Sequence, residues 1–365
     1  MRLESKIINQ EINNGDVIFN FIVKRNSIIF LFLSLLVFVL FALDLVSGDS
    51  ALSVGQVWNV FTGNETDMTT RNIVLSIRLV RVIVAVLIGV ALSISGLQMQ
   101  TVFRNPLAGP SVLGISSGAS MGVAFVVLLS GSLGGVALSK LGFMGEIALS
   151  IAAVIGSLSV MALIVYVSQK VKGNVTLLII GVMIGYVANA VIGVLKFFSV
   201  EEDIRAYVIW GLGSFSRVSG NQMMLFVAIM AILIPLSFLL IKTLNLMLLG
   251  DGYARNLGLN IKRARLLVIT SAGVLTAIVT AYCGPVIFLG LAVPHLCRAI
   301  FQTSDHRVLM PAVLFAGAAL ALVCNLVARM PGFEGALPVN SVTALIGAPV
   351  VASVLFRKRK NELNE

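Results

Sequence analysis

The chain has 365 residues, of which 58% are hydrophobic and 12% are charged. Soluble domains carry about a quarter of charged residues, and one water-soluble core could not bury this much apolar surface. The apolar runs are long and unbroken, unlike the short alternating segments of a membrane β-barrel. These proportions predict an all-α integral membrane protein whose main solvent is lipid.

The formal net charge of +10 arises from 26 basic residues against 16 acidic residues. In a soluble domain such an excess suggests a nucleic-acid partner. Here the basic residues gather between the apolar runs, which is typical of membrane topology. We therefore expect no nucleic-acid partner.

Apolar runs of about 17–25 residues predict about ten transmembrane helices. In chain order these runs cover residues 28–47, 79–99, 111–131, 147–168, 175–198, 222–241, 264–283, 286–301, 309–328 and 340–356. Gly284, Pro285 and Pro294 interrupt the pattern at residues 284–301. Broken helices of this kind are tolerated where protein or a cavity surrounds them.

The distribution of charge predicts the orientation of the chain. The first residues include Glu4, Glu11 and Asp16 and lack a cleavage site of small residues, so they do not indicate a signal peptide. Most basic residues fall on one side if the N-terminus is cytoplasmic, which favours two cytoplasmic termini and an even number of spans. We expect a cytoplasmic leader at residues 1–27, one transmembrane domain at 28–356 and a basic cytoplasmic tail at 357–365.

The sequence lacks the means to energise transport alone. No G-x-x-x-x-G-K-[ST] motif is present, which excludes a phosphate-binding loop of that type. The acidic residues lie near predicted span ends or in loops, with Asp44 and Glu146 nearest to spans, whereas ion-coupled carriers usually keep a carboxylate at mid-membrane. We therefore expect energy from another subunit, although a secondary carrier remains an alternative.

The cysteines and histidines predict neither a metal site nor a cofactor. Cys283, Cys297 and Cys324 form no C-x-x-C pair and lie in apolar sequence, which favours buried free thiols. His295 and His306 are too few for a metal cluster.

One motif admits a catalytic interpretation. Residues 114–118 match G-x-S-x-G, so Ser116 could serve an intramembrane serine hydrolase if a base lay nearby. Gly114, Gly118 and Gly122 recur at intervals of four, which instead predicts a helix face for close packing. We favour packing and keep the hydrolase as an alternative class.

Several segments over about residues 75–355 are informative when taken together. They are RLVR at 78–81, SGLQMQ at 95–100, RNPLAGP at 104–110, LG at 113–114, SGA at 117–119, WGLGS at 210–214, LLGDGYARNLG at 248–258, GLAVPHLCR at 290–298, DHR at 305–307, LPV at 337–339 and TALIGAP at 343–349. In sequence and in order they resemble the permease subunits of iron-siderophore, haem and cobalamin ABC importers (the FecCD/BtuC-like permeases). Val80 stands where the family has proline, and Asn325 where many relatives have aspartate.

The resemblance implies the fold of a cobalamin permease, that is, of a type II ABC importer. It implies a homodimer in the bacterial inner membrane, with two ATP-binding subunits and a periplasmic substrate-binding protein. The implied cargo is a large metal chelate, with a ferric siderophore ranked before cobalamin and haem. This chain would translocate the cargo without catalytic residues, cofactor or resident metal.

The resemblance also assigns roles to residues on the outer side. Arg78 and Arg81 are three residues apart, so they share one helix face. With Arg329 they are implied to dock the binding protein. The alternative is that their side chains reach to lipid headgroups.

On the inner side, residues 244–258 resemble the helices that couple these permeases to the ATPase, and an interfacial amphipathic helix is the alternative. Arg104, Asn105 and Pro106 end a predicted helix and are interpreted as a cytoplasmic rim. Gly290, Pro294 and His295 are interpreted as gating or scaffold positions. The coupling residues are Leu248, Gly250, Asp251, Ala254, Arg255, Leu257 and Gly258.

Overall fold

The computed structural model describes residues 2–48, 52–64, 67–132, 143–171, 173–218, 220–329 and 337–362. Within these ranges every regular element is a helix, as the composition predicted. The predicted spans correspond to α1 (Arg2–Val46), α4 (Leu79–Phe103), α5 (Ile115–Ser132), α6 (Phe143–Lys170), α7 (Asn174–Phe197), α9 (Gly220–Phe238), α12 (Ile261–Cys283), α13 (Leu289–Phe301), α14 (His306–Ala328) and α15 (Val339–Glu362). Each predicted range therefore overlaps a helix over most of its length.

Six helices in the described part are long and apolar enough to cross a membrane. A seventh follows if α9 and α10 (Ile241–Leu248), which meet at a 43° bend, form one span. Residues Ile115–Leu129, Leu289–Phe301 and Val339–Ser353 form shorter apolar helices. The count of ten spans therefore stays a prediction.

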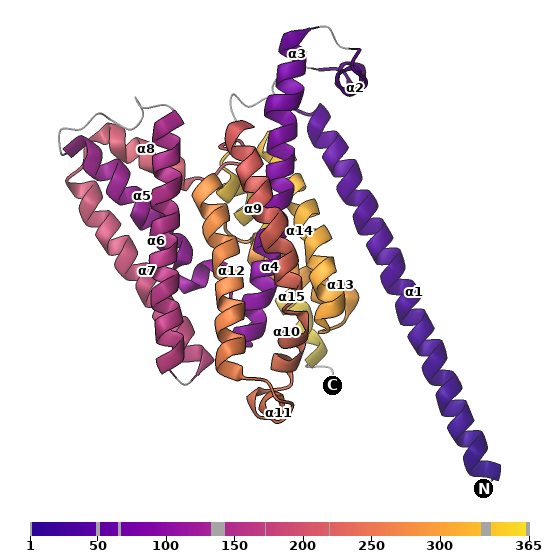
Figure 1. Ribbon diagram of the computed structural model, residues 1–365. Coiled ribbons are helices and arrows are strands. Elements are labelled where there is room, and N and C mark those ends of the chain that lie inside the picture. Colours follow the sequence, from indigo (N-terminus) through magenta and orange to yellow (C-terminus); the bar gives the residue numbers. More distant parts are fainter. Residues whose placement is uncertain are drawn as a thin grey trace.

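Short elements connect these helices. On one side lie α2 (Val54–Thr62), α3 (Met68–Asn72), a π-helix (Ile73–Arg78) that continues α3 into α4, and α8 (Glu201–Gly211). On the opposite side lies α11 (Asp251–Asn256) (Figure 1). A 3-10 turn (Pro110–Leu113) precedes α5. The N-terminal end of α1 and the C-terminal end of α15 lie on the same side as α11 (Figure 1).

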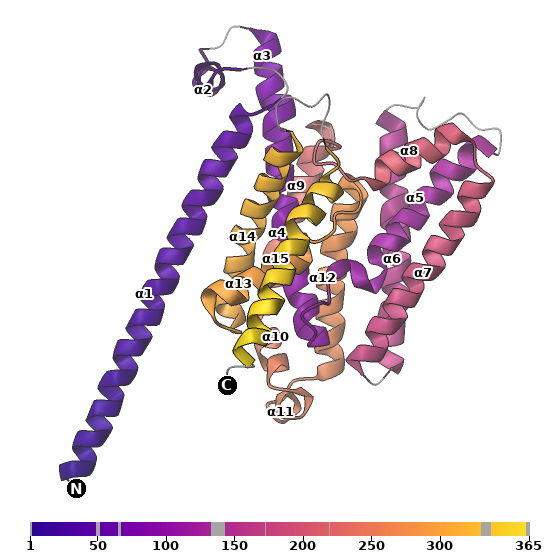
Figure 2. The same cartoon turned by 180° about the vertical axis from the view of Figure 1, so that it is seen from behind.

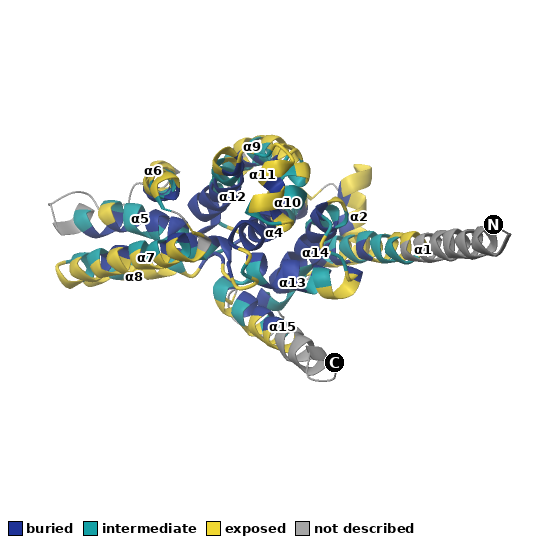
Figure 3. Ribbon diagram, turned by 90° about the horizontal axis from the view of Figure 1, so that it is seen from below, coloured by how far each residue is buried: buried dark blue, intermediate teal, exposed yellow. Residues whose placement is uncertain are grey.

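Helix α4 forms the centre of the molecule and packs against α12, α13 and α14. Figure 3 shows the buried residues concentrated in these four helices. The backbones of α4 and α13 meet at Gly96, where an added Cβ would lie 1.7 Å from the carbonyl oxygen of Gly290. Such close contacts are typical of membrane helices, where small residues permit dense packing.

Helices α5, α6, α7 and α8 form a second group beside α12, seen from both sides in Figures 1 and 2. Helix α5 crosses α6 closely, because a Cβ at Gly118 would lie 2.6 Å from the carbonyl oxygen of Gly156 and one at Gly122 would lie 2.2 Å from that of Ala152. The packing prediction is thus confirmed for Gly118 and Gly122. Gly114 instead ends the 3-10 turn with φ 75°.

We predict that Gly96→Ala lowers the thermal stability of the purified permease. The added methyl group cannot fit against Gly290, and overpacking of this kind costs about 1–3 kcal/mol. The matched control is Gly193→Ala on α7, where an added Cβ meets nothing within 4 Å. Equal melting temperatures for the two variants in detergent would contradict the close crossing of α4 and α13.

Candidate functional site

The segment predicted to couple to an ATPase folds as two short helices at the end of the molecule. Helix α10 ends near Leu248, Gly250 makes the turn with φ 99°, and α11 leads to Gly258 with φ 86°. These positive φ values are accessible to glycine at little cost. The two glycines therefore make the turns on either side of α11.

The two faces of α11 differ. Ala254 is fully buried, whereas Tyr253 and Leu257 are 73% and 61% exposed. Leu248 and Leu249 are also exposed, and the Arg255 side chain is exposed beside them. The segment therefore presents an apolar tip (Leu248, Leu249, Tyr253 and Leu257) away from the core.

The base of this segment is bonded to the predicted rim. The Arg104 guanidinium donates to the Asp251 carboxylate at 2.5 Å and to the Met247 carbonyl oxygen at 3.2 Å. Arg265 of α12 lies 3.7 Å from the same carboxylate. The structure thus joins two sites that the sequence analysis treated separately, since Arg104 ends α4 and Asp251 begins α11.

The rim is a helix stop, as predicted, because α4 ends at Phe103. The Asn105 side chain accepts a hydrogen bond from the Leu107 N–H at 2.9 Å, which closes the turn. His295 Nε2 donates to the Pro106 carbonyl oxygen at 2.7 Å. His295 and Pro294 are buried in α13, and with Gly290 against α4 they hold this turn in place. The scaffold interpretation has support from these contacts, while a gating role stays a prediction.

Asn245 is a connecting residue that the sequence analysis missed. Its Oδ1 accepts from the His306 backbone N–H at 2.8 Å and lies 2.7 Å from His306 Nδ1, while its Nδ2 donates to Asp305 at 2.6 Å. His306 Nε2 lies 2.8 Å from Thr101 Oγ1 of α4. These side chains bind α10 to α4 and α14. The one available signal was a lone amide within the apolar run LNLML at residues 244–248.

Asp305 is ionised at neutral pH in this network. Partial burial raises the pKa of its carboxyl, but hydrogen bonds from the Arg307 N–H and the Asn245 amide, with the nearby Arg307 charge, outweigh that effect. The pKa therefore lies below its usual value, and Asp305 also accepts at the start of α14 as its N-cap.

Two of the arginines implied to dock the binding protein are buried in the structure. Arg78 and Arg81 are only 2% and 1% exposed, so they do not form an exposed pair in this chain. The Arg78 guanidinium donates to the carbonyl oxygens of Leu45 and Val46, at 3.0 and 2.5 Å. It thus satisfies carbonyl groups that the end of α1 leaves without helical partners.

Arg81 and Arg329 lie near a buried carboxylate. Asp44 of α1 accepts from the Asn325 amide of α14 at 2.7 Å, and both arginines interact with it electrostatically. Arg329 is partly exposed and donates to Ser216 Oγ at 3.2 Å. A carboxylate of α1 therefore lies against Asn325, the position where the resemblance implied an aspartate. Docking by these three arginines stays a prediction.

Ser116 has no histidine partner of the kind a nucleophile needs among the contacts of the described residues. Its hydroxyl lies 3.5 Å from Thr280 Oγ1, while the His295 ring contacts Pro106 and the His306 ring contacts Thr101 and Asn245. The arrangement therefore gives no support to the hydrolase alternative. The three cysteines are buried and free, and no metal-binding cluster occurs among the described residues.

A shallow hollow of about 240 Å³ lies between α7 and the start of α5. Its polar lining comes from Ser111, Ser117, Tyr186 and Asn189. Gly181 and Gly185 also line it and leave space because they have no side chains. Hydroxyl and amide groups facing outward from an apolar helix are costly in lipid. The hollow therefore marks the face of α7 that is best suited to a polar path.

The comparisons with known proteins agree with this arrangement. The model of the FecCD transport family matches residues 35–357. The chain belongs to the FecCD transport family.

The relatives of this FecCD-family chain are permeases. It is 34% identical over 314 residues to the hemin transport system permease protein HmuU of Yersinia pestis, covering 86% of this chain and 90% of HmuU. It is 34% identical over 309 residues to the vitamin B12 import system permease protein BtuC of Klebsiella pneumoniae, covering 85% of this chain and 89% of BtuC. Both relatives were expected from the resemblance, which is confirmed.

A solved structure described as an inward-facing conformation of a metal-chelate type ABC transporter superposes with a TM-score of 0.78 at 27% identity. The match covers 91% of this chain and 99% of that chain. The chain is thus a multi-pass membrane permease of the ABC importers for haem, cobalamin or metal chelates. It is a transport component and not an enzyme.

We predict that Asn245→Ala lowers the free energy of unfolding of the permease by about 1–3 kcal/mol, because it removes the Asn245 partner of the buried His306 ring. Asn189→Ala is the control, since Asn189 is exposed in the hollow. The melting temperatures of both variants are measured in detergent, with the loss of the monodisperse species as the signal. An unchanged melting temperature for Asn245→Ala would show that the network is not formed.

Proposed function

We propose that this chain translocates a ferric siderophore or a related metal chelate across the bacterial inner membrane, driven by a separate ATPase. The observation that carries the proposal is the apolar tip of α10 and α11, bonded at its base to α4 and α14. A force applied to this tip reaches the transmembrane helices through Arg104, Asn245 and His306. Cobalamin and haem remain the alternative cargoes, since the relatives are named for vitamin B12 and hemin import.

The proposed orientation places α11 and both termini in the cytoplasm. The side of α11 carries Arg104, Lys170, Lys242, Lys262, Arg263 and Arg265, in keeping with the positive-inside rule. The exposed Tyr253 and Leu257 would then face the ATPase. A tyrosine at the centre of a docking site often carries much of the binding energy, and neighbouring apolar side chains exclude water around it.

We further propose a homodimer in which α7 and α15 face the second copy across a central path. In Figure 3 both helices lie along the same edge of the molecule and expose residues there. The polar hollow on α7 would line the path, where a polar chelate can meet hydroxyl and amide groups. A closed two-fold arrangement allows two such hollows to face one another.

On the outer side, a periplasmic binding protein would dock at the predicted arginines. Arg329 offers the most accessible of the three guanidinium groups. Arg78 and Arg81 would reach the partner only if the end of α1 moved. We therefore expect Arg329→Glu to weaken association more than Arg78→Glu does.

The function is tested by reconstituting the permease with its ATPase and binding protein in proteoliposomes. We expect the loaded binding protein to stimulate ATP hydrolysis and uptake of labelled ferric siderophore, with labelled cobalamin as the parallel cargo. ATP hydrolysis that ignores the loaded binding protein would sink the proposal. Uptake that survives without ATP and collapses with the ion gradient would favour a secondary carrier.

We predict that Tyr253→Ala weakens binding of the ATPase by about tenfold or more, because it removes a large exposed ring from the docking tip. Tyr166→Ala is the matched control, since Tyr166 is 62% exposed at the same end of the molecule but lies on α6. The measurement is the affinity of each of the two permease variants for the purified ATPase, compared with that of the unaltered permease. Equal losses would contradict docking at α11.

We predict that Asn189→Cys reacts readily with a charged, membrane-impermeant thiol reagent, at a rate that depends on the nucleotide bound to the ATPase. The background is low because the three native cysteines are buried. Ile155→Cys on the exposed face of α6 is the control, because a thiol in lipid does not ionise. If both cysteines react alike, the hollow does not line a wet path.

A further inference from the structure

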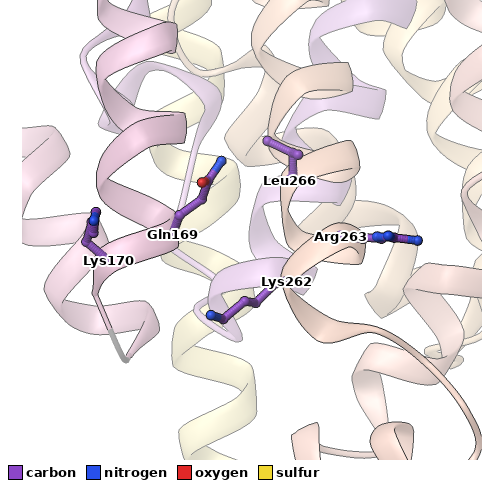
Figure 4. Close-up of a pocket in the computed structure, with 5 residues that line it drawn as sticks. All are labelled: Gln169, Lys170, Lys262, Arg263 and Leu266. Carbon is purple, nitrogen blue, oxygen red and sulfur yellow. The ribbon is translucent and has the colours of Figure 1, made fainter.

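A basic pocket lies between the end of α6 and the start of α12. Its volume is about 340 Å³, and Gln169, Lys170, Lys262, Arg263 and Leu266 line it. Figure 4 shows the side chains of Lys262 and Leu266 extending toward α6 and that of Gln169 toward α12, while the Arg263 guanidinium and the Lys170 ammonium group lie outside the gap between the two helices. The pocket therefore combines the Lys262 ammonium group and an amide with an apolar side chain, and two further cations lie at its rim.

The pocket lies at the level where a lipid headgroup would be found. The span Met144–Lys170 ends at it, and the span Ile261–Cys283 begins at it. The exposed Tyr166 lies one turn before the end of α6. The Lys170 ammonium nitrogen is 5.9 Å from the centroid of the Tyr166 ring. Tyrosine rings are enriched at the membrane interface, and lysines beside them reach the headgroups.

The positive charge at this pocket is not neutralised by a carboxylate in the part of the chain that the structure describes. Among the described residues, Lys170, Lys262 and Arg263 form no ion pair with a carboxylate, whereas Arg104 and Arg265 both lie against Asp251. The pocket therefore suits an external anion.

The apolar part of the lining favours a lipid as the source of that anion. Leu266 and the exposed Leu267 continue α12 into the apolar region directly beyond the cations. In Figure 3, α6 lies on the edge of the molecule opposite α7 and α15, the helices proposed to face the second copy. A molecule at this edge can place its phosphate among the lysines and its acyl chains along Leu266.

We propose that this pocket binds the phosphate-bearing headgroup of an anionic phospholipid. Lys262 between the helices and Lys170 at the rim supply the charge, the Gln169 amide supplies a hydrogen-bond donor, and Leu266 contacts the acyl chain. Basic pockets between transmembrane helices bind anionic headgroups for the same reason. This inference does not depend on the cargo or on the ATPase.

The test uses the full chain purified in detergent, with lipid adducts counted by native mass spectrometry. The probes are phosphatidylglycerol, phosphatidylcholine and inorganic phosphate. We expect phosphatidylglycerol to be retained in preference to phosphatidylcholine, and Lys170→Gln with Lys262→Gln to lower its retention by about tenfold or more. The control is Lys24→Gln with Lys242→Gln, which removes the same charge from the same side outside the pocket.

Three results would overturn the proposal. Equal loss in the two double variants would indicate diffuse surface charge. Displacement of the lipid by millimolar inorganic phosphate would indicate a site for the free anion. Unchanged lipid adducts together with lost assembly of the ATPase would indicate a protein contact.

Discussion

The close packing of α4 is the constraint on which the rest of this permease depends. The helix is buried along most of its length, and its backbone meets α13 at Gly96 and α14 at Gly89. Lipid offers no hydrogen bonds to polar groups at this depth, so they must be satisfied by neighbouring helices. Ser95 accordingly donates to the Ala272 carbonyl oxygen of α12 at 2.8 Å and lies 2.9 Å from Thr276 Oγ1.

This packing gives the inner end of α4 a fixed position from which two connections reach the coupling segment. Arg104 holds Asp251 and the Met247 carbonyl group, while Thr101 contacts His306, whose other ring nitrogen meets Asn245. The Arg104 pair is partly exposed and contributes little stability by itself. The partly buried Asn245 amide and the buried His306 imidazole contribute more, because leaving either unsatisfied is costly. We therefore expect a movement of α10 to displace α4 and α14 as well.

Much of this could be predicted from the sequence. Apolar runs located the helices, because lipid requires about twenty apolar residues to cross it. The end of α4 before Pro106 was predictable, because proline disfavours a helical conformation in the residue before it. Turns at Gly250 and Gly258 are equally local features, because glycine adopts positive φ at little cost. The family resemblance supplied the coupling role of residues 244–258, which local pattern alone left equal to an interfacial helix.

What the sequence could not predict depends on contacts between distant segments. Spacing put Arg78 and Arg81 on one face, but it could not show that the end of α1 covers that face and that Arg78 binds its carbonyl groups. Asn325 has no carboxylate of its own, and only the fold shows that Asp44, 281 positions away in the sequence, lies against it. Asn245 had no motif of its own, since its role arises from its place beside His306.

The most direct test of the account is the amount of cargo transported per ATP hydrolysed by proteoliposomes containing Asn245→Ala, compared with the unaltered permease under conditions where both remain folded. If the buried network transmits movement from the coupling segment to α4 and α14, the variant will still hydrolyse ATP but will transport less cargo for each ATP. An unchanged ratio would contradict the account, because it would show that transmission does not need the Asn245 and His306 contacts.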